Sequence, residues 1–299
     1  MKSIFKAMDV HDIITLCLAS KTMRSLVKHD EPIPIDVYVQ TSMKLIADDR
    51  IPICELRAIK PEELAKWQSQ KQPAKITIND YLGAALFLFG QKAIRRLLFQ
   101  NNLNEDFLES VFRSIPSCEN VTIYSQVSDS SQRRIFARYG KTTRQLDFYG
   151  IPPVELRHRI MIQNLNSLNI QNEWIKLDHL LSMNCSSLGV ANLDPQILNR
   201  FLKLWIHNKI CPRLEYMQTD LFELNLKQVL TGIQYQEISM ETVRTFKHSK
   251  RAIESDHWLR LVDTMEVRGG FDFMRRDGTP ATIAIRPRYN RWRMEFFVW

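Results

Sequence analysis

Glycine and long apolar runs are scarce in this sequence, and each scarcity excludes a class of function. Nine glycines in 299 residues leave little material for phosphate-cradling loops, and no Walker A, dinucleotide-binding, H-E-x-x-H or G-x-S-x-G motif is present. The longest apolar run, residues 82–90, is about half as long as a bilayer-spanning helix. We therefore expect a protein that is not an enzyme, uses no cofactor and makes no membrane contact.

Cysteine is also scarce, and its spacing does not indicate disulfide bonds. The five cysteines are widely spaced and form no C-x-x-C pair, which is typical of reduced thiols in the cytoplasm or nucleus. Asp9, His11 and Asp12 interrupt the apolar stretch near the start, where an export signal needs a continuous apolar core. We therefore expect a cytoplasmic protein, a nuclear protein or both.

Four candidate metal ligands lie close together in the sequence. His179, Cys185, His207 and Cys211 all fall within residues 177–217. Structural zinc sites draw on close pairs such as C-x-x-C, and these four residues contain no such pair. We therefore predict that they bind no metal and belong to the scaffold.

Strand-like and helix-like segments alternate from about residue 100 onward. Apolar-x-apolar strands begin at residues 121, 146, 168, 188 and 214, and amphipathic stretches separate them. The clearest helix follows an Asp194 cap, has Pro195 in its first position, and predicts a buried stripe of Leu198, Phe201, Leu202 and Trp205. Strand repeats of this period are typical of leucine-rich repeats. We therefore expect an irregular, leucine-rich-like β-α repeat layer.

The two ends of the chain differ from this alternating middle. Residues 1–28 predict three short helices, and a boundary near residue 30 precedes a predicted strand at 35–40, a helix at 61–68 and a strand at 74–80. Near the other end, Asp277-Gly278 lies between two alternating segments, which predicts an antiparallel hairpin. The expected fold class is therefore α/β, with α+β character at the ends and a C-terminal antiparallel β-meander over 266–299.

Positive charge is concentrated in the C-terminal 33 residues, where seven arginines stand against three acidic residues. Arginines favour acidic or phosphorylated partners, because the guanidinium group forms charge-assisted hydrogen bonds with such groups. The candidate target-binding residues are Arg275, Arg276, Arg288, Arg291 and Arg293. A solvated basic edge is the alternative interpretation of the same residues.

Two parts of the chain resemble a known family. The opening "MKSIFKAMDVHDIITLCLASKTMRSLVK" resembles the later part of an F-box. The segment 164–217, from "NLNSLNI" to "CPRLEYM", resembles the F-box-associated domain, type 2, of the large nematode F-box protein family, as does "GGFDFMRRDGTPATIAI" near the end. The resemblance implies a partial F-box over 1–29 and an F-box-associated domain over 30–299, most recognisable at 145–218.

This resemblance implies a protein-binding role without covalent chemistry. Members recruit substrates to SCF-type cullin ubiquitin ligases: the F-box binds a SKP-family adaptor, and through it a cullin, while the C-terminal domain binds a protein target. The positions that fall on the F-box pattern are Ile4, Met8, Ile14, Leu16, Leu18, Ser20, Lys21 and Val27. The L-P segment that normally precedes them is missing here, so we expect either weakened adaptor binding or a start codon further upstream.

Two alternatives remain at this stage. A shortened F-box also fits a repeat-based protein-binding module that is no longer coupled to a ligase, and adaptor co-purification would separate the two. A basic, aromatic C-terminus also fits nucleic-acid binding. Against nucleic acid, a net charge of +8 is below that of most basic nucleic-acid-binding domains, and the same aromatic residues fit the packed side of a hairpin.

Overall fold

The computed structural model describes the chain as two compact units. It describes residues 35–39, 42–47, 51–57, 94–101, 103, 105–171, 174–208, 210–221, 225–253, 261–288 and 291–299. Unit 1 covers Met1–Thr143, and unit 2 covers Arg144–Trp299. The helices predicted in 1–28 and at 61–68 and the strand predicted at 74–80 lie outside the described residues. Among the helices that are described, none is long and apolar enough to cross a membrane.

Unit 1 contains five strands and two helices in its described part. The strands are β1 (Ile35–Val39), β2 (Ser42–Ala47), β3 (Ile51–Arg57), β4 (Ile94–Phe99) and β5 (Cys118–Ile123), and the helices are α6 (Glu105–Ser114) and α7 (Asp129–Tyr139). The strand order is β3-β2-β1-β4-β5. The β1–β2 and β2–β3 pairs are antiparallel, whereas β1, β4 and β5 run parallel. The strand predicted at 35–40 is confirmed as β1.

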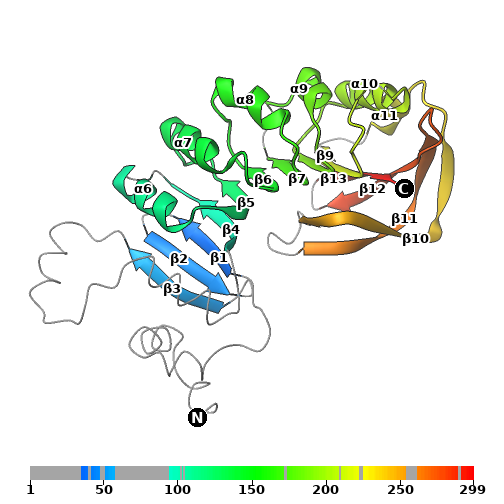
Figure 1. Ribbon diagram of the computed structural model, residues 1–299. Coiled ribbons are helices and arrows are strands. Elements are labelled where there is room, and N and C mark those ends of the chain that lie inside the picture. Colours follow the sequence, from blue (N-terminus) through cyan, green and yellow to red (C-terminus); the bar gives the residue numbers. More distant parts are fainter. Residues whose placement is uncertain are drawn as a thin grey trace, which may run out of the picture. The chain divides into compact units, whose positions relative to one another are not determined.

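Unit 2 begins with four parallel strands that alternate with helices. The elements are β6 (Gln145–Phe148), α8 (Val154–Met161), β7 (Ser167–Ile170), α9 (Leu177–Ser182), β8 (Ser187–Val190), α10 (Pro195–Ile206), β9 (Tyr216–Leu221) and α11 (Leu226–Leu230). In Figure 1, α8 to α11 lie along one side of these strands. The described chain is thus of mixed α/β class, as predicted.

Four antiparallel strands complete unit 2. They are β10 (Gln236–Ile253), β11 (Leu261–Met274), β12 (Pro280–Arg288) and β13 (Arg291–Val298). They continue the sheet in the order β9-β13-β12-β11-β10, because β13 pairs antiparallel with β9. The turn between β11 and β12 contains Asp277-Gly278, and Gly278 has a φ of 87°, which glycine adopts without steric cost. The predicted hairpin is confirmed.

The strands of unit 2 have one apolar face and one face that is partly polar. Side chains alternate along a strand, and Leu188 on β8 lies beside Met217 on β9, which lies beside Phe296 on β13. On the other face, Gly189 lies beside Gln218, which lies beside Glu295. The helices cover the apolar face, and the opposite face carries polar groups such as Gln218 and Glu295.

Helix α10 holds the apolar face together. The Asp194 carboxylate accepts hydrogen bonds from the backbone nitrogens of Gln196 at 2.7 Å and Ile197 at 3.2 Å, so the helix begins where its cap predicts. The predicted stripe of Leu198, Phe201, Leu202 and Trp205 is fully buried. Trp205 meets the Phe296 ring of β13 edge-on, with centroids 5.0 Å apart. This contact ties the parallel half of the sheet to the antiparallel half.

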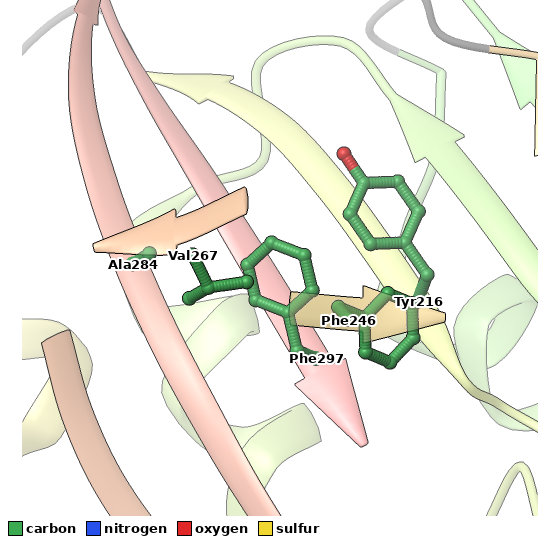
Figure 2. Packing of buried hydrophobic residues seen from close by; sticks show 5 residues of the cluster. All are labelled: Tyr216, Phe246, Val267, Ala284 and Phe297. Atoms are coloured by element: carbon green, nitrogen blue, oxygen red, sulfur yellow. The ribbon is translucent and has the colours of Figure 1, made fainter. Parts of the chain in front are cut away.

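A second core lies on the opposite face of the same sheet. Tyr216, Phe246, Val267, Ala284 and Phe297 form a buried cluster, to which each of the five strands β9 to β13 contributes one residue (Figure 2). In a flat sheet β10 and β9 would be roughly 19 Å apart, since strands are spaced at about 4.8 Å. The rings of Tyr216 and Phe246 are only 6.3 Å apart. The sheet must therefore curl until β10 lies over β9.

The structure corrects one predicted strand. We predicted an apolar-x-apolar strand at Leu214, but β9 begins at Tyr216, and Met217 is the residue in register with Leu188. Cys211 has a φ of 47° and its carbonyl accepts a hydrogen bond from the Leu214 nitrogen at 3.1 Å. This tight turn keeps Leu214 buried but outside the strand, so the spacing to β9 is longer than the sequence pattern indicates.

Candidate functional site

The predicted arginines fall at two opposite ends of β12. Arg275 and Arg276 lie in the turn before this strand, and Arg288 and Arg291 lie at the turn after it. A strand of nine residues spans roughly 25 Å, because each residue advances the chain by about 3.3 Å. The five arginines therefore form no single patch. Each end has its own hollow, and both hollows lie wholly within unit 2.

At the Arg288 end, the arginines are already engaged with the fold. The Nε of Arg293 lies 3.1 Å from the Asp220 Oδ1, and the Nη1 of Arg288 lies 3.4 Å from the Asp220 Oδ2. Arg291 donates from Nη1 to the side-chain oxygen of Asn192 at 3.3 Å. Asp220 thus offsets part of the positive charge, and these arginines help to join β13 to the strands beside it.

A small polar pocket lies beside this arginine group. Its volume is about 100 Å³, and its lining residues are Tyr216, Gln218, Arg286, Pro287, Arg288, Arg293 and Glu295. The buried Glu295 carboxylate accepts a hydrogen bond from the Tyr216 hydroxyl at 3.0 Å, and its Oε2 lies 2.9 Å from the Arg286 Nε. Burial and the neighbouring Glu295 raise the pKa of Tyr216 well above its usual value. The three arginines of the pocket are thus already ion-paired with Glu295 or Asp220, and a volume of about 100 Å³ leaves little room for a ligand.

At the other end, Arg275 and Arg276 differ in their surroundings. The Arg275 Nη2 lies 2.8 Å from the Asp277 Oδ2, and its guanidinium lies over the Trp205 ring at 4.9 Å. The hydrogen bond from Arg275 holds the pKa of Asp277 well below its usual value. Arg276 is exposed. Arg275 therefore supports the β11–β12 turn, and Arg276 remains available to solvent.

A larger groove opens at this end of the sheet. It has a volume of about 440 Å³, and its lining residues are Ser186, Pro212, Arg213, Leu214, Glu215, Phe246, Lys247, Arg275, Val298 and Trp299. It thus combines three cationic side chains with one acidic side chain and two aromatic rings. Of these residues, the predicted target-binding set contains only Arg275. Arg213 and Lys247 were missed because they are 34 residues apart in the sequence and come from a loop and a strand.

The four candidate metal ligands have separate roles in the scaffold. Cys185 and Cys211 are buried, and the Cys211 thiol donates weakly to the Leu180 and Met183 carbonyls at 3.4 and 3.5 Å. The His179 Nδ1 accepts a hydrogen bond from the Lys176 nitrogen at 3.1 Å, and His207 caps the C-terminus of α10. In the described part of the chain, no group of three histidine, cysteine or acidic residues is arranged to hold a metal ion.

The predicted adaptor-binding residues cannot be placed from the structure. Ile4, Met8, Ile14, Leu16, Leu18, Ser20, Lys21 and Val27 all lie outside the described residues. The division into units at residue 143 does not test the predicted boundary near residue 30. The adaptor-binding assignment therefore stays a prediction from the sequence.

Comparison with known proteins gives a match to a family model. No curated protein and no solved structure matches the chain. Residues 157–219 match a family model described as F-box associated. The matched segment runs from α8 to β9 and includes the loop 211–215, which forms one wall of the larger groove. Unit 2 therefore contains a segment that is similar to the F-box-associated family, in agreement with the resemblance of residues 145–218.

Proposed function

We propose that this protein is a substrate-recruiting subunit of an SCF-type cullin ubiquitin ligase. The observation that carries the proposal is the F-box-associated match at residues 157–219. In this proposal the N-terminal residues 1–29 bind a SKP-family adaptor, and unit 2 binds a protein target. The chain performs no covalent chemistry itself and acts in the cytoplasm, the nucleus or both.

The form of unit 2 supports a binding role. Its helices and the Trp205–Phe296 contact fix one face of the sheet, while the second core around Phe246 fixes the curled hairpin on the other face. Both faces of β9 and β13 are therefore packed, and surface hollows lie at the ends of the strands. Rigid scaffolds that present polar groups at strand ends and loops are well suited to recognising partners.

The adaptor half of the proposal is tested by titration. We expect purified SKP-family adaptor to bind the full chain, and Leu16→Asp to weaken binding by at least about a hundredfold, because the substitution places a charge in an apolar interface. Leu16→Met is the matched control and should bind like the wild type, since it conserves volume and apolarity. Isothermal titration calorimetry measures all three. Absence of binding by the wild-type chain would favour a protein-binding module that is independent of a ligase.

A further inference from the structure

The groove of about 440 Å³ beside Trp299 combines fixed walls, an aromatic surface and positive charge. We propose that it binds an acidic, unphosphorylated segment of the target protein, with an apolar side chain of that segment on the Trp299 ring and its carboxylates near Lys247 and Arg213. The assignment rests on the proposed function, because it places the target-binding surface within unit 2.

One wall of the groove is a fixed loop. The Cys211 thiol reaches the carbonyls at the end of α9, and the Arg213 Nη1 donates to the Asn184 carbonyl at 3.0 Å. The backbone nitrogens of Glu215 and Val298 donate to the Ser186 and Glu215 carbonyls, both at 2.8 Å. The loop is therefore bound to both the preceding helix and the sheet, so a ligand would meet a preformed surface at small entropic cost.

The aromatic surface of the groove is equally well fixed. The Trp299 Nε1 donates to the Thr282 hydroxyl at 2.7 Å, and that hydroxyl donates to the Asp272 Oδ1 at 2.6 Å. Asp272 also holds Arg244, whose guanidinium lies 5.0 Å from the Trp299 ring centroid. Despite these contacts, 37% of Trp299 stays exposed. A large aromatic ring that is both held in place and accessible is the usual anchor of a protein interface.

The charged side chains of the groove determine which kind of target segment can bind. Arg213, Lys247 and Arg275 face a single carboxylate, that of Glu215, so the groove has an excess of positive charge. Arg275 is paired with Asp277. Lys247 is exposed, and within the described part of the chain it has no ion-pair partner. The excess charge of the groove favours an acidic partner.

The same arrangement favours carboxylates over phosphate. Bidentate recognition of phosphate relies on guanidinium groups that converge and donate in pairs. Here Arg213 already donates to a carbonyl, and Arg275 already donates to Asp277 and Thr279. The groups left to bind a ligand are the exposed Lys247 ammonium and the partly engaged Arg213 guanidinium. Single carboxylates along an extended segment match these separate charges.

The test uses a fluorescent peptide of about ten residues in which four aspartates surround a central phenylalanine. Fluorescence anisotropy at low salt should show binding to the full chain, and Lys247→Glu should weaken it roughly fivefold or more, because one attraction becomes a repulsion. Lys247→Arg should retain binding. Lys227→Glu is the matched control, since Lys227 is exposed on α11 and lines no part of the groove. Trp299→Ala should weaken binding of the peptide more than Lys247→Glu does, because it removes the aromatic ring on which the phenylalanine packs.

Each outcome bears on the proposal. Weaker binding by Lys247→Glu alone, with Lys227→Glu unchanged, supports it. Equal loss in both lysine variants would reduce the effect to overall charge and overturn the assignment. Absence of any binding would also overturn the assignment. The same holds if a phosphoserine version of the peptide binds more tightly and its binding depends on Arg288 or Arg293 instead of Lys247. If adaptor binding persists while the acidic peptide fails, only the groove assignment is lost and the ligase proposal survives.

Discussion

Replacing Trp205 with alanine is expected to destabilise unit 2 by about 3 to 5 kcal/mol, the usual cost of deleting a fully buried tryptophan. Trp205 has no exposed surface, and its ring contacts Phe273 at 6.2 Å and Phe296 at 5.0 Å between centroids. It also carries the cation–π contact with Arg275. Because this one ring joins α10 to β11, β13 and the β11–β12 turn, its loss should lower the free energy of unfolding. Urea unfolding followed by circular dichroism measures the change.

Trp205→Phe is the matched control for this experiment. The Trp205 Nε1 has no hydrogen-bond partner among the described residues. Phenylalanine would therefore keep an aromatic ring at the contact with Phe296 without leaving a new polar group unpaired, and it should cost clearly less than alanine. If both variants unfold at the wild-type urea concentration, the role assigned to α10 in joining the halves of the sheet is wrong.

The stability of unit 2 should fall steeply above about pH 9. Burial raises the pKa of the Cys185 and Cys211 thiols to about 12, from an ordinary value near 9. The folded state therefore keeps protons that the unfolded state releases, so this stabilisation is complete below about pH 9 and is lost as the pH rises toward 12. Each thiol should contribute about 1.4 kcal/mol per pH unit in this window. The raised pKa of Tyr216 acts in the same direction from about pH 10.

Urea unfolding at intervals from pH 8 to pH 11, in the presence of a reductant, measures this dependence. The matched variant is Cys185→Ala with Cys211→Ala, which removes both thiols. Its starting stability will be lower, so the quantity to compare is the slope of unfolding free energy against pH. We expect a slope shallower by roughly 3 kcal/mol per pH unit between pH 9 and pH 11. Identical slopes would mean that these thiols are not buried as described.

Local signals in the sequence were sufficient for some elements of unit 2. The cap at Asp194, Pro195 in the first turn and the apolar stripe through Trp205 are all determined within twelve residues of α10, and all are confirmed. The β11–β12 hairpin was predictable for the same reason, since glycine at 278 supplies the positive φ of the turn. Such features depend on interactions between near neighbours and need no knowledge of the tertiary fold.

Other features depended on distant contacts and could not be predicted. Leu214 fits an apolar-x-apolar pattern, but the turn at Cys211 delays β9 until Tyr216. The curl of the sheet brings Phe246 into contact with Tyr216 across four strand spacings. No local sequence pattern predicts this contact. The five predicted arginines are close in sequence, yet the length of β12 separates them. A strand converts neighbours in sequence into groups far apart in space.

Glu295 is a residue that the sequence could have indicated. It is a single acidic residue within "WRMEFFVW", an otherwise apolar and basic strand. A carboxylate at such a position needs partners once the strand is buried. The structure supplies them in Tyr216 and Arg286. A lone charge within an apolar strand therefore indicates a polar cluster, even where it does not identify the partners.

The most direct test of the account is affinity purification of the full-length chain from cells, with partners identified by mass spectrometry. We expect the wild type to retain a SKP-family adaptor, a cullin and a reproducible target. Leu16→Asp should lose the adaptor and cullin but keep the target, whereas Lys247→Glu should keep the adaptor and cullin but recover much less of the target. Purification of the wild-type chain without any SKP-family adaptor or cullin would contradict the proposed function.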